Sequence, residues 1–127
     1  IDEVSSLIAE KQDKFILVKT KDRSIKINFE SILYAELNRR VITYYLTGGR
    51  TVESISLRGT FMEAMTELLA DKRFYLCNVG MVVNLDYITE IETGAVVFGN
   101  NCRSFLGEKY CRKLRGVWSE YLFDREV

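Results

Sequence analysis

The fold class is decided by residues 32–54, which read Ile32-Leu-Tyr-Ala-Glu-Leu-Asn-Arg-Arg-Val-Ile-Thr-Tyr-Tyr-Leu-Thr-Gly-Gly-Arg-Thr-Val-Glu-Ser54. Residues 32–37 and 41–46 are rich in β-branched and aromatic side chains, which are typical of strands. Residues 47–50 have the composition of a tight hairpin turn, and the strand that begins at Thr51 returns as its partner. The stretch therefore predicts a succession of short strands.

Further short strands flank this stretch on both sides. We predict them at residues 15–20, 24–28, 86–92, 95–98 and 102–106. In residues 24–28, for example, Ile25 and Ile27 alternate with polar residues and so share one face. The segment 74–84 is apolar on both sides of Asn78 and Gly80.

Two segments change to a helical period. Residues 60–70 carry apolar side chains at helical spacing, and Thr60 with Glu63 has the spacing of a capping box. From Glu108 onward, Tyr110 and Leu114 again share a side with later apolar residues, which predicts a second helix. Residues 2–13 have the pattern of a short amphipathic helix, so we expect residues 1–14 to be a connector helix or linker from an upstream domain.

Composition argues against catalysis. The chain has 127 residues, enough for one domain, and contains no His and three Cys. Without His, neither a Ser–His nor a Cys–His pair can form, and the Cys residues lack the spacing of a zinc clamp. Glycine-rich phosphate-binding motifs are also missing. We therefore predict a protein that is not an enzyme, with no catalytic residue, cofactor or metal site.

The cysteines and the hydropathy also bear on the cellular compartment. Three free thiols suit a reducing cytosol, and no apolar run approaches the roughly 20 residues that a membrane span needs. We accordingly expect a cytoplasmic protein with no membrane contact in this segment. Because the chain begins at Ile1 and not at Met, we expect it to be a piece of a longer protein.

Charge is distributed in blocks, although the chain holds 18 basic and 18 acidic residues and its formal net charge is zero. Residues 15–60 carry eight Lys or Arg against four acids, and residues 101–115 carry five against one, so each block has a net charge of +4. The remaining segments are acidic. A folded chain can place such blocks on different faces, so a zero total does not exclude an anionic partner.

The order of these signals resembles the LytTR (LytR/AgrA-type) DNA-binding domain of bacterial response regulators. Four stretches carry the resemblance: Ile32-Leu-Tyr-Ala-Glu36, the helix at 61–69, the segment 74–84, and Leu106-Gly-Glu-Lys-Tyr110 with Leu114 after it. Together they cover roughly residues 15–115. The resemblance implies a mainly β domain (α+β by count) over residues 15–127, with short antiparallel sheets and two or three short helices.

The resemblance also implies where DNA is contacted. Family members read the major groove with side chains from loops between strands, and they touch two successive grooves on one face of the duplex. Transferred to this chain, the contact residues are Asn38, Arg39, Arg40, Asn78 and Lys109, and the basic Arg112 and Lys113 follow on the last helix. Arg can pair with guanine, Asn with adenine, and Lys or Arg with phosphate, so the residue types fit the role.

Each of these residues also has an ordinary structural interpretation. Arg39 and Arg40 could be a solvated turn, Asn78 could satisfy backbone groups, and Arg112 with Lys113 could be a polar helix face. The chain departs from the family pattern at seven positions, which are Leu76, Asn78, Val79, Gly80, Met81, Gly107 and Glu108. Val79 cannot form a hydrogen bond to a base, and Glu108 would either repel phosphate or cap a helix.

From the sequence we predict sequence-specific binding of double-stranded DNA by the output domain of a bacterial transcriptional regulator of a two-component system. The resemblance implies promoter direct repeats as the target, a homodimer on DNA, and an upstream receiver or sensor domain. The alternative is a LytTR-like fold with weakened DNA reading that serves as a protein-interaction or regulatory module. A steep loss of DNA affinity with salt would distinguish the first from the second.

Overall fold

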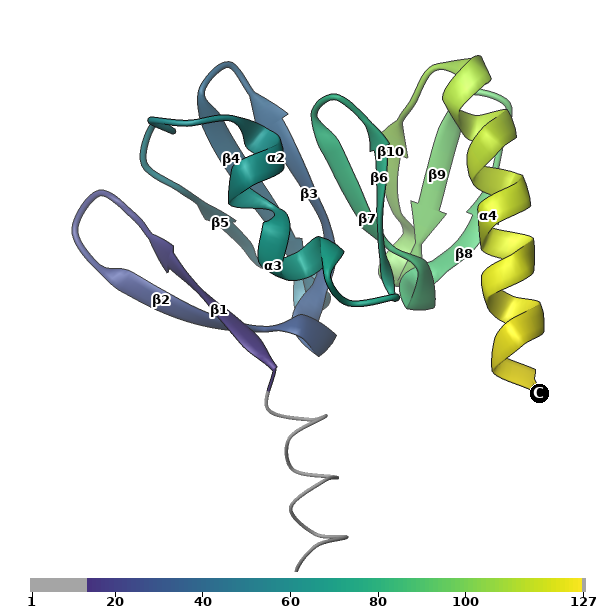
Figure 1. The fold of residues 1–127 in the computed structure, drawn as a ribbon, viewed down its shortest axis with the longest axis horizontal. Coiled ribbons are helices and arrows are strands. Elements are labelled where there is room, and N and C mark those ends of the chain that lie inside the picture. The colour runs from purple at the N-terminus through teal and green to yellow at the C-terminus, as the bar shows by residue number, and fades with distance from the viewer. Residues whose placement is uncertain (1–13, 127) are drawn as a thin grey trace, which may run out of the picture.

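The structure, a computed structural model, describes residues 14–126. The connector predicted for residues 1–14 lies outside the described residues, apart from its last position. Three antiparallel sheets and three helices make up the described part of the chain (Figure 1). This arrangement confirms the predicted fold class.

The sheets contain two, five and three strands. The two-stranded sheet consists of β1 (Phe15–Lys19) and β2 (Ser24–Asn28). The five-stranded sheet has the order β5-β4-β3-β7-β6, from β3 (Ile32–Asn38), β4 (Val41–Leu46), β5 (Thr51–Glu53), β6 (Phe74–Asn78) and β7 (Met81–Asn84). The three-stranded sheet has the order β10-β9-β8, from β8 (Ile88–Ile91), β9 (Ala95–Phe98) and β10 (Cys102–Phe105).

The helices are α2 (Phe61–Ala64), α3 (Thr66–Leu69) and α4 (Glu108–Glu126). Single 3₁₀ turns lie at Phe29–Ser31, Thr47–Gly49, Leu85–Tyr87 and Gly99–Asn101. The predicted capping box is present, because the Thr60 hydroxyl accepts from the Glu63 amide while the Glu63 carboxylate accepts from the Thr60 amide. The helix predicted at 60–70 is divided at Met65, where ψ is 2°, although backbone hydrogen bonds continue across the division.

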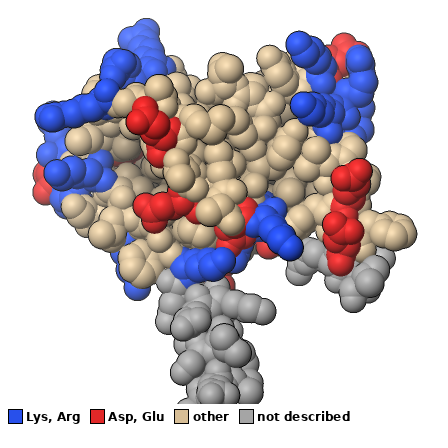
Figure 2. All heavy atoms as spheres, viewed as in Figure 1, with Lys and Arg blue, Asp and Glu red and all other residues tan. Residues whose placement is uncertain are grey.

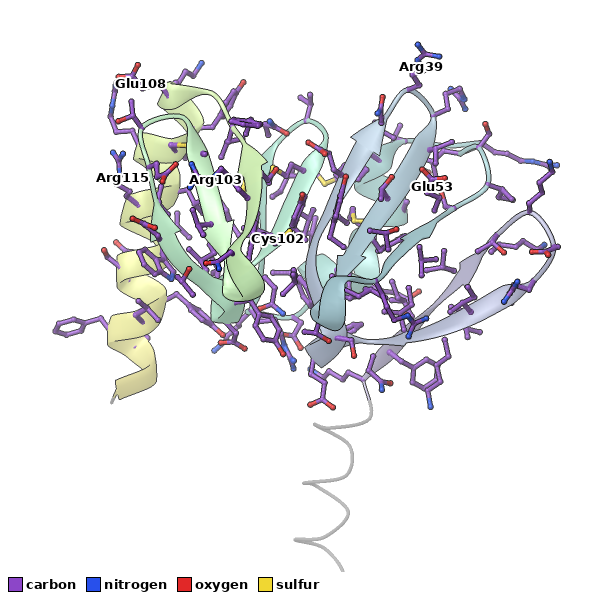
Figure 3. All side chains as sticks on the ribbon, turned by 180° about the vertical axis from the view of Figure 1, so that it is seen from behind. Arg39, Glu53, Cys102, Arg103, Glu108 and Arg115 are labelled. Carbon is purple, nitrogen blue, oxygen red and sulfur yellow. The ribbon has the colours of Figure 1, made fainter. Side chains whose placement is uncertain are left out.

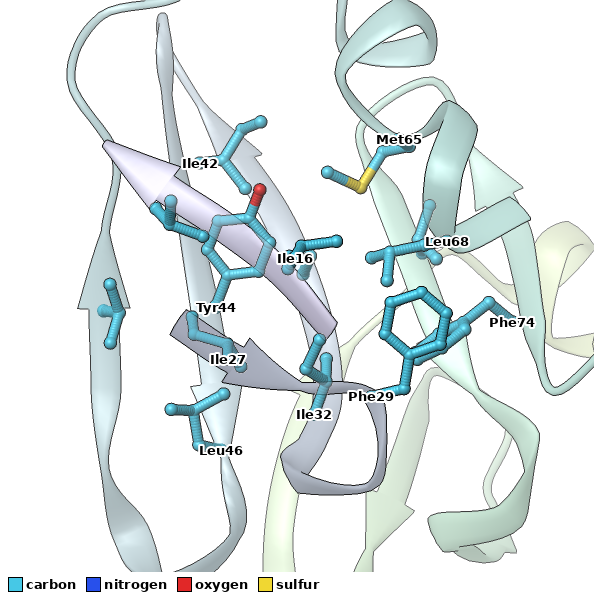
Figure 4. Close-up of a cluster of buried hydrophobic side chains, with 14 of the residues drawn as sticks. Ile16, Ile27, Phe29, Ile32, Ile42, Tyr44, Leu46, Met65, Leu68 and Phe74 are labelled. Atoms are coloured by element: carbon cyan, nitrogen blue, oxygen red, sulfur yellow. The ribbon is translucent and has the colours of Figure 1, made fainter. Parts of the chain in front are cut away.

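The central strands β3 and β7 of the five-stranded sheet carry buried side chains on both faces, whereas β4 and β5 are buried mainly on one face. On one face lies the first core, where the side chains of β3 and β4 meet α2, α3 and the β1–β2 hairpin; Figure 4 shows it, and it includes Ile32, Ala35, Tyr44, Met65 and Leu68. On the other face lies the second core, where the sheet meets β8–β10 and α4; it includes Tyr34, Met81, Val83, Phe98 and Leu114. The sheet is therefore a shared wall between two layers.

An irregularity in β3 lets this strand supply both cores. The pairing of β3 with β4 shifts between Ile32 and Tyr34, so Leu33 and Tyr34 both face the second core, whereas Ile32 faces the first. The fully buried Asn84 secures this point, because its amide nitrogen donates to the Ile32 carbonyl at 2.9 Å. Its Oδ1 accepts from the Asp86 amide at 2.9 Å and so also fixes the turn after β7.

Aromatic rings connect the two larger sheets. Tyr34 stacks on Tyr45 at a centroid distance of 4.2 Å and on Phe98 at 4.8 Å, so three rings run from β4 through β3 to β9. Such offset contacts add stabilisation beyond the burial of apolar area. Helix α4 completes this layer by burying Cys111 and Leu114. Within residues 14–126, no helix is long and apolar enough to cross a bilayer.

We expect Asn84→Ala to lower the free energy of unfolding by about 2–3 kcal/mol, because the Ile32 carbonyl loses its amide partner inside the core. Urea denaturation measures the change. Asn38→Ala is the matched control: its exposed side chain should contribute less than about 0.5 kcal/mol. Equal stability of the two variants would show that the Asn84 bond does not hold the β3–β7 junction.

Alkaline pH should destabilise the fold through buried tyrosines. Burial raises the pKa of Tyr44 from 10.0 to about 12. The associated stabilisation is therefore complete below pH 10 and is lost as pH rises from 10 towards 12, by up to about 3 kcal/mol. Urea denaturation between pH 8 and 12 should show a shallower loss for Tyr44→Phe than for the wild type. The same steep loss in both proteins would contradict this assignment.

Candidate nucleic-acid interface

The β3–β4 hairpin presents two arginines in a two-residue loop. Asn38 pairs with Val41, so Arg39 and Arg40 form the whole turn, and both are exposed. Arg39 has a φ of 63°, in the left-handed region that two-residue hairpin loops demand at their first position. The Arg40 guanidinium donates to the Leu57 carbonyl, and the Leu57 amide donates to the Arg40 carbonyl at 2.7 Å. Arg39 therefore extends into solvent, while Arg40 also holds the neighbouring segment.

The β6–β7 turn lies directly beside this hairpin. The Leu37 amide donates to the Gly80 carbonyl at 2.7 Å, which ties the end of β3 to the turn. A Cβ at Gly80 would come within 3.3 Å of the Leu37 side chain, so the close approach favours glycine. Asn78 fixes the turn through its Oδ1, which accepts from the Gly80 amide at 2.9 Å. At the tip, Val79 is 90% exposed.

The first turn of α4 lies on the other side of the β6–β7 turn. The Gly107 carbonyl accepts from the Tyr110 and Cys111 amides, which starts the helix. Tyr110 lines an apolar groove of about 370 Å³ together with Thr60, Phe61, Met62, Leu76, Asn78 and Val79. Lys109 is exposed, with its Nζ 5.5 Å from the centre of the Tyr110 ring.

These contacts place three loops in a row along one edge of the molecule. In Figure 1 the β3–β4 hairpin, the β6–β7 turn and the start of α4 all lie along the upper edge. Figure 2 shows Lys and Arg at the two upper corners, with mostly uncharged surface between them. Figure 3, seen from behind, places Arg39 at one end of this edge and Glu108 at the other. We call this surface the three-loop edge.

The residues predicted from the last helix have unequal surroundings. Arg112 lies 3.5 Å from the Glu108 carboxylate, and both side chains are largely exposed. Such an exposed pair contributes little to stability, so the arginine can exchange this partner for another anion at small cost. Lys113 is exposed as well. The acidic Glu108 therefore reduces the positive charge at this end of the edge without removing it.

Part of the second basic block is bonded to Glu92, away from the edge. Arg103 donates to the Glu92 carboxylate at 2.7 Å, and Arg115 donates to the Glu92 backbone carbonyl at 3.2 Å. Figure 3 shows Arg103 and Arg115 below Glu108, on the body of the domain. Of the five basic residues at 101–115, Lys109, Arg112 and Lys113 remain as candidates for the edge.

The structure adds three residues that the sequence did not single out as site residues. Arg58 follows Leu57, the residue bonded to Arg40, so its exposed side chain belongs to the β3–β4 end of the edge. Met62 and Tyr110 line the central groove. Arg58 was already counted in the first basic block. By contrast, nothing in the spacing of Met62 and Tyr110 indicates that α2 and α4 approach the same turn.

The buried thiols Cys77 and Cys111 are not reactive groups. Burial raises the pKa of Cys77 to about 12 and also raises the pKa of Cys111, so both remain protonated near neutral pH. Within the part of the chain that the structure describes, no three His, Cys, Asp or Glu side chains gather as metal ligands. The three-loop edge, with guanidinium, ammonium and amide groups, is suited to binding an anion by charge and hydrogen bonding.

Comparisons with known proteins agree with this fold. The family model of the LytTr DNA-binding domain matches residues 22–119. A solved structure, the LytTr DNA-binding domain of a protein described as a methyl-accepting/DNA response regulator from Bacillus cereus, has a TM-score of 0.63 and 19% sequence identity. That match covers 83% of this chain and 96% of the other, and at this identity it shows a common fold. No curated protein matches the chain.

The left-handed backbone at Arg39 should lower the stability of the fold. Arg39→Gly should raise the free energy of unfolding by about 0.5–1 kcal/mol, because glycine adopts this φ without strain. Arg50→Gly is the matched control, since Arg50 is an exposed hairpin residue with an ordinary φ of −82°. There glycine only adds freedom to the unfolded chain and should destabilise. Thermal or urea unfolding that ranks the two variants the other way would contradict the assigned turn.

Proposed function

The chain belongs to the LytTr DNA-binding domain family, and we propose that its three-loop edge binds double-stranded DNA in a sequence-specific manner. We further propose that the domain is the output module of a bacterial transcriptional regulator. Members of the family are DNA-binding domains and not enzymes. What we propose for this chain is the surface and the residues that bind DNA.

One observation carries the proposal: residues from both basic blocks, Arg39 and Lys109 among them, lie on a single edge although these two are about 70 positions apart along the chain. Positive charge on opposite faces could not contact one duplex. Figure 2 instead shows basic groups at both ends of the same edge. Because phosphates dominate DNA affinity, a local concentration of charge matters more than the zero total.

The two ends and the centre have different proposed roles. Arg39 extends freely and can make a bidentate contact with guanine or with a phosphate. Lys109 and Lys113 suit phosphates, which fix the register of the protein on the duplex. At the centre, Asn78 uses Oδ1 within its own turn but keeps its amide nitrogen to donate to a base or to the backbone. Arg40 and Arg112 supply further charge beside these residues.

The same proposal extends to the DNA target and to how copies of the protein are arranged on it. A hairpin tip with basic groups on both sides suits the major groove, with phosphates of the two strands at its borders. We propose promoter direct repeats as the target, with two copies of the protein paired on the DNA. An upstream receiver or sensor domain would control how the two copies are brought together.

We expect Arg39→Ala and Lys109→Ala each to weaken binding to a duplex selected from a random library, by about 1–3 kcal/mol where a base contact is lost. Fluorescence anisotropy measures the affinity. Arg50→Ala is the matched control: it removes the same charge from the turn at the opposite end of β4, away from the three-loop edge. Equal losses in all three variants would indicate that charge alone, and not this edge, determines binding.

The salt dependence provides a separate measurement on the same duplex. If about five basic side chains contact phosphate, log K should fall with log[salt] with a slope near −4.5. Removal of Lys109 or Lys113 should reduce the magnitude of this slope by about 0.9, which is the contribution of one phosphate contact. A flat salt response, or enrichment of no duplex at all, would contradict DNA binding by this domain.

A further inference from the structure

Val79 is the most exposed of the large apolar side chains that the structure describes, at 90%. It belongs to neither core cluster, so it contributes little to the stability of the fold. It lies at the tip of the β6–β7 turn, which Figure 1 shows between the β3–β4 hairpin and the start of α4. Val79 is therefore an exposed apolar side chain on mostly uncharged surface between two basic ends, where it is available for contact with a ligand.

We propose that Val79 is a specificity-determining residue that recognises thymine through its C5-methyl group. In the major groove, thymine alone among the four bases presents a methyl group, and apolar side chains read it by contact. Val79 cannot form a hydrogen bond to a base, but it can make this contact. The inference rests on the proposed function, because it requires the edge to face the major groove.

The turn holds Val79 rigidly in place. Asn78 Oδ1 accepts from the Gly80 amide at 2.9 Å, and the Gly80 carbonyl accepts from the Leu37 amide at 2.7 Å, so both neighbours of Val79 are fixed. Valine is also β-branched and has a restricted χ1. Its methyl groups are therefore presented in few conformations, and contact with a base requires little ordering of the side chain.

The surroundings of Val79 extend the apolar contact. The groove of about 370 Å³ beside it is lined mainly by Phe61, Met62, Leu76 and Tyr110. A methyl group next to Val79 would thus lie over apolar surface and lose contact with water. Arg39 and Lys109 lie on the two sides, where they would hold the duplex by its phosphates. This combination favours a nucleic acid over an apolar peptide as the occupant.

The test is a double-mutant cycle between protein and DNA. A duplex is first selected from a random library with the wild-type protein, and each thymine is then replaced in turn by deoxyuridine, which removes only the methyl group. At one thymine or more, the replacement should weaken wild-type binding about threefold to fivefold, as expected for a buried methyl group. Val79→Ala should weaken binding to the thymine duplex by a similar factor and should abolish the difference between the two duplexes.

Leu17→Ala is the matched control, because Leu17 is 68% exposed and lies on β1, outside the three-loop edge. This variant should retain the full difference between thymine and deoxyuridine. If no thymine shows a difference that depends on Val79, while Arg39→Ala and Lys109→Ala still weaken binding, the methyl contact is overturned and the DNA interface stands. If those two variants also bind as the wild type does, the proposed function is overturned as well.

Discussion

Burial of the central strands of the five-stranded sheet, β3 and β7, on both faces is the constraint on which the rest of the structure depends. One face needs α2, α3 and the β1–β2 hairpin to cover it, and the other needs β8–β10 and α4. Strand β3 serves both layers because its pairing shifts at Leu33, and Asn84 satisfies the Ile32 carbonyl at that point. Because β3 and β7 are covered on both faces, these two strands can offer a ligand only the loops at their ends.

The same architecture explains how a chain of zero net charge can bind a polyanion. The antiparallel pairing of β3 with β7 places the turn after β3 next to the turn before β7. Because α4 packs beside β6, its first turn joins them. The basic residues of these loops therefore lie on one edge, together with the acidic Glu108, while Arg103 and Arg115 are bonded to Glu92 away from this edge. The pairing of the strands and the packing of α4 therefore determine which charged residues share a surface.

Much of the fold could be predicted from local sequence. The strands around Asn38-Arg39-Arg40 and the capping box of Thr60 and Glu63 have local causes, so propensity and spacing were sufficient. The contacts between loops have no such cause. The bond between Leu37 and Gly80 and the approach of Tyr110 to Val79 depend on how the sheets pack, as does the bond from Arg40 to Leu57. The sequence thus named candidate residues, and only the structure could place them on one edge.

The central claim is that three separate loops form one DNA-binding edge, and backbone amide chemical shifts during titration with a selected duplex test it most directly. We expect the largest changes to occur together at Arg39, at Val79 and Gly80, and at Lys109. The turn at Gly48 and Gly49, at the opposite end of β4, should remain unchanged. Changes centred on that turn, or confined to one of the three loops, would contradict the account.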